Sequence, residues 1–255
     1  MHILITNDDG IHAPGIIGLA NEFSKYANVT VVAPEYEQSG VSHALTFLKP
    51  INAIALPSAF HNVKRFAVNG TPSDCTRLGI LELCGTQPDV VISGINCGLN
   101  VGVNCLYSGT IGGAREGSFF ELPSFAISLE VLHKGQPDTH HIQRASQLSR
   151  ELILDRLLPN IKSKMTMYNI NLPLAAMEQS VDVATVPMET RRFEYHFDKG
   201  NDPAGRPYFW TKHVASEIRN LNGTDVSAVE HGKIAVTPMT YDLTDYGQID
   251  TEECR

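Results

Sequence analysis

The chain begins with the stretch HILITNDDG (residues 2–10), in which a short apolar run ends in two aspartates and a glycine. The run Ile3-Leu4-Ile5 predicts a buried strand. In open α/β sheets, ligands bind beyond the carboxyl ends of the strands. Two carboxylates there repel each other unless a cation lies between them, and their oxygens suit Mg²⁺, Mn²⁺ or Ca²⁺. Asp8 and Asp9 therefore indicate a metal site, although an ordinary Asn/Asp/Gly turn with solvated acids fits the same residues.

The first half of the chain alternates the signals of strands and helices. Strands are predicted over 2–6, 29–33, 44–56, 63–68, 89–93 and 123–129. Helices are predicted over 14–26, from an N-cap at Thr71 or Ser73 to about Cys84, and from about Thr110 onward. Such a βαβ rhythm predicts an α/β fold with a doubly wound, mostly parallel sheet.

The second half has a different pattern. It predicts a long amphipathic helix over 138–158, strands over 167–172 and 233–238, and a short helix over 224–230. The aromatic-rich segment 189–212, with a turn at 201–205, predicts an extended β-hairpin. Its aromatic side chains suggest a contact between subunits, the alternative being a hairpin folded back on its own domain. Glycine and proline interrupt the pattern near residues 130–140, which separates an N-terminal part (1–135) from a C-terminal part (136–255). We expect the two parts to form one continuous domain.

Composition restricts the function classes. The 255 residues carry a net charge of −8, which disfavours nucleic-acid polymers and anionic membranes as partners. The sequence has no apolar run long enough to span a membrane and no signal-peptide pattern, so a cytoplasmic location is predicted. The five cysteines form no C-x-x-C pair, which favours free thiols and argues against zinc.

Three polar loops follow three of the predicted strands. Asp8-Asp9 follows the first, Gln38-Ser39-Gly40 the second, and Ser93-Gly94-Ile95-Asn96 the strand at 89–93. If these strands are neighbours, the loops meet at one edge of the sheet. Two carboxylates, a hydroxyl and a carboxamide then form an all-oxygen donor set that suits Mg²⁺ or Mn²⁺.

A fourth loop, Tyr107-Ser108-Gly109-Thr110, opens a predicted helix. Backbone N–H groups at a helix N-terminus bind anions, although a plain N-cap by Ser108 or Thr110 explains the same residues. Beside a metal site, the loop predicts a phosphate cradle and hence metal-assisted attack of water on phosphorus. His12 and His43 lie near these loops, where a lone histidine is more often polar surface than a catalytic group.

Seven segments occur in order along almost the whole chain. They are ILITNDDGIHAPGI (3–16), APEYEQSGVSHALT (33–46), VNGTPSDCTRLG (68–79), PDVVISGINCGLNVG (88–102), YSGTIGGAREG (107–117), NINLP (169–173) and IAVTPMTYDLTD (234–245). Together they resemble the SurE family of survival-protein nucleotidases. The resemblance implies a Rossmann-like N-terminal domain and a smaller C-terminal part with an oligomerisation hairpin.

The resemblance also implies an activity and its residues. It implies a phosphatase acting on nucleoside 5′- and 3′-monophosphates, and in some members on short polyphosphate, with one divalent metal, Mg²⁺ or Mn²⁺, per subunit in a homodimer or homotetramer. The implied metal ligands are Asp8, Asp9, Ser39 and Asn96. The implied substrate-binding residues are Ser39, Gly40, Asn96, Ser108, Gly109 and Thr110, and the implied catalytic residues are Asp8, Asp9, Asn96, Ser108 and Thr110.

Three other interpretations remain open at the level of sequence. Asp8 or Asp9 could act as a nucleophile that forms an aspartyl phosphate. A signalling receiver also has paired acids after its first strand, but it needs an aspartate where this chain has Asn96, and a late lysine that is not evident. A non-catalytic nucleotide-binding module is the third. Cys97 and Cys105 lie in the glycine-rich loop, and Gly113 stands where the family often has alanine, which leaves substrate preference open.

Overall fold

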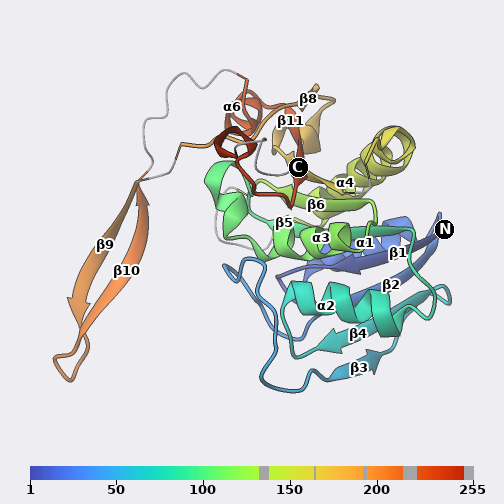
Figure 1. Ribbon diagram of the computed structural model, residues 1–255, viewed down its shortest axis with the longest axis horizontal. Coiled ribbons are helices and arrows are strands. Elements are labelled where there is room, and N and C mark those ends of the chain that lie inside the picture. Colours follow the sequence, from blue (N-terminus) through green and yellow to red (C-terminus); the bar gives the residue numbers. More distant parts are fainter. Residues whose placement is uncertain (132–137, 164, 192–193, 215–222, 250–255) are drawn as a thin grey trace.

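A nine-stranded sheet forms the centre of the computed structural model, which describes residues 1–131, 138–163, 165–191, 194–214 and 223–249 (Figure 1). In sheet order, the strands are β3 (Ala53–Leu56), β4 (Val63–Val68), β2 (Asn28–Pro34), β1 (His2–Thr6), β5 (Val90–Cys97), β6 (Ser124–Leu129), β7 (Thr166–Leu172), β11 (Ile234–Thr240) and β8 (Val183–Thr185). The six strands from β4 to β7 run parallel, whereas β3 and β11 are antiparallel to their neighbours β4 and β7. The predicted doubly wound, mostly parallel sheet is confirmed.

Both faces of the sheet are covered by helices, as the continuous apolar runs of the strands require. On β1, Ile3 and Ile5 pack with α1 (Pro14–Phe23) and α4 (Thr139–Arg150). Leu4, between them, points to the opposite face and packs with residues of α2 (Pro72–Leu78) and the turn after it. The helix α3 (Gly109–Phe119) lies beside α2 on that second face.

The sheet reverses its winding direction at β1 and β5. From β1 the chain proceeds outward through β2 to β4, and from β5 it proceeds the other way through β6 to β7. Loops at such a switch point leave a crevice beyond the carboxyl ends of the strands. Asp8 and Asp9 follow β1 directly, and Asn96 lies near the end of β5, so the topology places these loops next to each other.

Several predicted elements have different lengths in the structure. Only the last four residues of the predicted strand 44–56 pair, as the edge strand β3, because the segment before it is a loop held by side chains. The strand β8 was not expected, since three residues leave no clear pattern. Short helical turns extend or precede helices at Gly79–Leu83, Gly102–Leu106, Glu151–Leu157 and Leu158–Asn160, and another follows β11 at Tyr246–Gln248.

The C-terminal half adds strands to the same sheet and one separate hairpin. The sheet contains β7, β11 and β8 from beyond residue 135, with α5 (Ala175–Glu178) and α6 (Asp225–Glu230) beside them. The predicted boundary itself falls among residues 132–137, outside the described residues. The hairpin of β9 (Glu194–Asn201) and β10 (Pro207–Val214) projects from the body of the molecule (Figure 1).

Two smaller findings concern membranes and thiols. No helix in the described part of the chain is long and apolar enough to cross a membrane. Cys75, Cys84, Cys97 and Cys105 are free thiols, and Cys254 lies outside the described residues.

Candidate active site

Asp8 and Asp9 are fixed where the chain leaves β1. Asn7 donates from Nδ2 to the carbonyl oxygen of Gly10 at 2.9 Å, which closes the turn around the two acids. Asp8 is only 4% exposed, and its Oδ1 accepts a hydrogen bond of 2.6 Å from the hydroxyl of Thr110. The Oδ2 of Asp9 accepts from the backbone N–H of Cys97 at 3.3 Å. The two acids are thus held in place by α3 and by the end of β5.

The pair carries more negative charge than its surroundings compensate. Burial raises the pKa of Asp8, and the Thr110 hydroxyl only partly opposes that effect. Burial, and then the charge of Asp8, raise the pKa of Asp9 to about 6. In the described part of the chain no cation lowers either pKa, and Glu37 raises both further. A divalent cation would relieve this repulsion.

Asn96 and Ser39 reach the same place from β5 and from the loop after β2. The pairing of β5 with β6 shifts between Ser93 and Asn96, an irregularity of the kind that redirects side chains near functional sites. Asn96 donates from Nδ2 to Gly98 O at 2.7 Å, which leaves its amide oxygen as the atom suited to a metal. The backbone N–H of Gln38 donates to Asp8 O at 2.7 Å and brings Ser39 alongside the acids.

The N-terminus of α3 lies against Asp8. The Ser108 hydroxyl accepts from the N–H of Ile111 at 3.2 Å, so it caps the helix, and its own hydrogen remains free to donate. A Cβ on Gly109 would lie 2.9 Å from the Cβ of Asp8, so only glycine allows this approach. The Thr110 side chain is fully buried and faces Asp8. The predicted anion loop and the predicted metal site are therefore adjacent.

A cleft of about 700 Å³ opens in front of these groups. Of the residues predicted from sequence, it is lined by Asp8, Asp9, Ser39, Gly40, Asn96 and Ser108. Gly109 and Thr110 lie behind it and shape it from the helix. The structure thus brings all eight predicted site residues together.

The cleft is also lined by residues to which the sequence analysis gives no binding or catalytic role. Glu37, Cys97, Leu99, Asn100, Asn104, Tyr107 and Thr211 complete its lining. Asn100 is held by residues that are distant in the sequence. Its carbonyl oxygen accepts hydrogen bonds from Nδ2 of both Asn169 and Asn171, at 2.8 and 3.1 Å. Both asparagines belong to the NINLP motif (169–173), but no feature of the sequence near this motif connects it with the cleft.

Neither histidine near the loops lines the cleft. His12 lies on the exposed surface, and His43 directs its ring to Glu116.

The glycine-rich loop before α3 has a second buried anchor besides the contacts of Asn100. Asp225 is fully buried, and its Oδ2 accepts from the N–H of Gly102 at 2.8 Å. Its Oδ1 accepts from the N–H of Glu189, also at 2.8 Å. This aspartate, from the C-terminal half, therefore ties the loop that borders the cleft to the segment leading into the hairpin.

The donors at the cleft suit a hard divalent cation. They are two carboxylates, a hydroxyl and an amide oxygen, and magnesium and manganese prefer such oxygen ligands. Within the described ranges, no group of three His, Cys, Asp or Glu side chains gathers as a metal site. The uncompensated charge of Asp8 and Asp9 supports the same fit.

Comparison with known proteins gives a consistent set of relatives. A family model described as "Survival protein SurE" matches residues 3–195. Proteins named 5′-nucleotidase SurE from Heliobacterium modesticaldum and Desulfatibacillum aliphaticivorans are each 40% identical to this chain, over 249 and 250 residues. These alignments cover 98% and 97% of this chain, and 89% and 95% of the relatives. The crystal structure of the SurE protein from Aquifex aeolicus matches with a TM-score of 0.81 and 32% identity, covering 97% of this chain and 96% of that one.

Proposed function

The chain belongs to the SurE family, and we propose that the cleft bordered by Asp8 and Ser108 is where it hydrolyses nucleoside monophosphates. Its activity is that of a 5′-nucleotidase, a phosphoric monoester hydrolase, in which water converts the ester to a nucleoside and phosphate. Nucleoside 3′-monophosphates and short polyphosphate are further proposed substrates, since they present the same phosphoryl end.

One observation carries the proposal. The 2.6 Å hydrogen bond from Thr110 to Asp8 joins the acidic side of the cleft to the first turn of α3. A phosphate bound there would meet a helix N-terminus, whose N–H groups and dipole favour anions. The same phosphate would lie beside the two carboxylates, which repel it unless a cation intervenes. Metal and phosphate are therefore expected to bind together.

The family implies a divalent metal, and we assign its ligands to Asp8, Asp9, Ser39 and Asn96. One Mg²⁺ or Mn²⁺ per subunit is proposed, because both accept an all-oxygen set. When bound, this cation supplies Lewis-acid polarisation of a phosphoryl oxygen and lowers the pKa of water.

The chain's own groups bind and orient the ester. Ser108 donates its hydroxyl hydrogen to the phosphate, and the N–H groups of the first turn of α3 stabilise the charge that grows on its oxygens. Gly40 has a φ of +72°, and nothing lies within 4 Å of the place where a Cβ would stand, so it leaves room for the substrate at the rim. The hydrogen bond from Thr110 lowers the pKa of Asp8 and so favours its ionised form, against the larger effect of burial.

The test is phosphate release from a panel of nucleoside monophosphates with Mg²⁺, Mn²⁺ or EDTA. Metal-dependent turnover is expected for the wild type, and Asp9→Asn should retain the fold by circular dichroism but lose nearly all turnover. No release with any metal would reject the phosphatase. Acid quench during turnover should trap no phosphorylated enzyme, since we propose water and not Asp8 or Asp9 as the nucleophile.

The proposal extends to assembly and location. Phe197, Phe209 and Trp210 are 58%, 58% and 70% exposed on the hairpin, and such aromatic side chains suit a subunit contact. We therefore propose a homodimer or homotetramer that uses this hairpin. The sheet passes through both predicted halves, so we treat residues 1–135 and 136–255 as one domain. A cytoplasmic location stays a prediction.

A further inference from the structure

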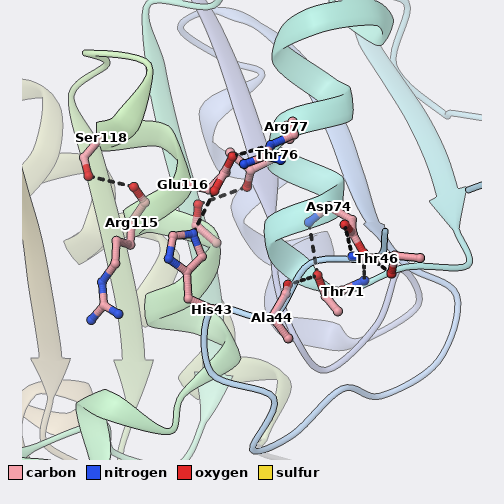
Figure 2. Close-up of polar contacts among 11 residues, drawn as sticks. His43, Ala44, Thr46, Thr71, Asp74, Thr76, Arg77, Arg115, Glu116 and Ser118 are labelled. Atoms are coloured by element: carbon pink, nitrogen blue, oxygen red, sulfur yellow. Dashed lines mark hydrogen bonds and ion pairs between the residues drawn. The ribbon is translucent and has the colours of Figure 1, made fainter. Parts of the chain in front are cut away.

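A fully buried carboxylate on α3 lies outside the cleft and has two donors. The Oε1 of Glu116 accepts from Nε of Arg77 at 2.7 Å, and its Oε2 accepts from Nε2 of His43, also at 2.7 Å (Figure 2). A buried carboxylate needs such partners for both oxygens, because each one lost leaves charge without compensation. Arg77 comes from α2, whereas His43 comes from the loop that carries Ser39.

The same loop has other anchors on either side of His43. They tie it to the turn before α3 and, as Figure 2 shows, to the start of α2. The N–H and hydroxyl of Ser42 donate to Tyr107 O and Leu106 O at 2.9 and 2.6 Å, Thr71 Oγ1 donates to Ala44 O at 2.7 Å, and the N–H and Oγ1 of Thr46 donate to the Asp74 carboxylate at 2.9 and 2.7 Å.

The loop runs in direct contact with α3. A Cβ on Gly112 would lie 2.2 Å from the carbonyl oxygen of Ser42, so only a glycine allows the loop to come this close to the helix. The ring of His43 also meets the ring of Phe119 edge-on, with centroids 5.0 Å apart. The ring is thus oriented from two sides, by Glu116 and by Phe119.

These contacts connect the two parts of the cleft. Ser39 precedes His43 by four residues in the loop, and Ser108 begins the helix that carries Glu116. Because α3 is one rigid element, a bond between His43 and Glu116 sets where the Ser39 loop lies relative to the first turn of the helix.

We propose that His43 is a positioning residue for this reaction, which holds the Ser39 loop against α3 through its hydrogen bond to Glu116. The proposal rests on the function assigned above, because Ser39 is one of the assigned metal ligands. It gives His43 a role distinct from proton transfer, since its Nε2 is directed at Glu116 and its ring does not line the cleft.

The experiment measures Mn²⁺ binding by electron paramagnetic resonance on metal-stripped full-length protein, together with kcat and KM. Mutating a residue that orients a metal ligand without binding the metal typically lowers metal affinity by about 10- to 100-fold. His43→Leu should therefore weaken Mn²⁺ binding about 10-fold, with kcat/KM falling in parallel. His43→Gln, whose amide nitrogen reaches about as far as Nε2, should bind Mn²⁺ within about threefold of the wild type.

Two further variants serve as controls. His61→Leu removes an exposed histidine from the turn between β3 and β4, and it should leave both measurements unchanged. His43→Asn keeps a polar side chain but withdraws the donor from Glu116, so it should resemble His43→Leu. If His43→Leu does not fold, the comparison of Asn with Gln decides.

Two results would overturn the proposal. One is a folded His43→Leu or His43→Asn that binds Mn²⁺ as tightly as the wild type. The other is a His43→Gln as weak as His43→Asn, because the donor would then not be the feature that matters. A wild type that releases no phosphate would reject the assigned function instead, and Mn²⁺ binding would still test His43.

Discussion

Replacing Thr110 with valine tests the connection between the acidic pair and the phosphate side of the cleft. Valine has nearly the same shape, so the fully buried side chain should still pack, but its hydroxyl is gone. The Oδ1 of Asp8 then loses its 2.6 Å hydrogen bond, although Asp8 is only 4% exposed and has little access to water in its place.

The expected loss follows from the charge on Asp8. Hydrogen bonds to charged groups contribute about 1.5–3 kcal/mol, and about 1.4 kcal/mol corresponds to a factor of ten in an equilibrium constant. Burial already raises the pKa of Asp8, and the Thr110 hydroxyl is the main opposing influence. Without it the pKa of Asp8 rises further, so Mn²⁺ must displace a proton up to a higher pH than in the wild type, and Mn²⁺ binding should weaken by up to about 100-fold where Asp8 is protonated.

The assay is a calorimetric or spin-resonance titration of metal-stripped protein with Mn²⁺. Thr110→Ser is the matched control, since it keeps the hydroxyl and should bind within a few-fold of the wild type. A folded Thr110→Val with unchanged Mn²⁺ affinity would refute the assignment of Asp8 as a ligand supported by Thr110.

Three other predictions concern pH, packing and assembly. The pKa of Asp9 is raised to about 6, so below that pH a metal must displace a proton from this carboxyl. Mn²⁺ affinity should therefore fall as the pH drops below about 6, with a slope that approaches about tenfold per pH unit. An affinity that does not change between pH 7 and 5 would contradict this prediction. Gly112→Ala places a Cβ against the carbonyl of Ser42 and should cost about 1–3 kcal/mol, seen as a melting temperature several degrees lower; an unchanged melt would show that the loop yields without cost. Deleting residues 192–210 should give monomers by light scattering, and an intact oligomer would place the subunit contact elsewhere.

Much of the site could be predicted because its parts are local in sequence. Asp8 and Asp9, Ser39, and Asn96 each follow a strand that an apolar run reveals, and parallel strands bring their ends to one edge. Ser108 could be placed in the same way, since a helix start is a local signal. Only the neighbourhood of the three strands had to be assumed, and the sheet order confirms it.

The remaining features depend on contacts between distant residues. Nothing near Thr110 in the sequence indicates that its hydroxyl faces Asp8, 102 residues away. The contact of His43 with Glu116 joins residues 73 apart, and each alone resembles ordinary polar surface. The strand predicted over 44–56 failed for a related reason, because Thr46 binds the Asp74 side chain and is thereby withdrawn from any ladder.

The hydrogen bond from Gly102 to Asp225 can form only late during synthesis of the chain. The N–H of Gly102 finds this carboxylate 123 residues further along the chain, so the glycine-rich loop stays without it until that residue has left the ribosome. Contacts of such sequence separation form late, because a long loop must close first. The acidic turn after β1 is thus among the earliest segments made, whereas the glycine-rich loop that borders the cleft gains this anchor only late. A nascent chain halted before α6 is expected to contain Asp8 and Asp9 while the loop that borders the cleft still lacks its contact with Asp225.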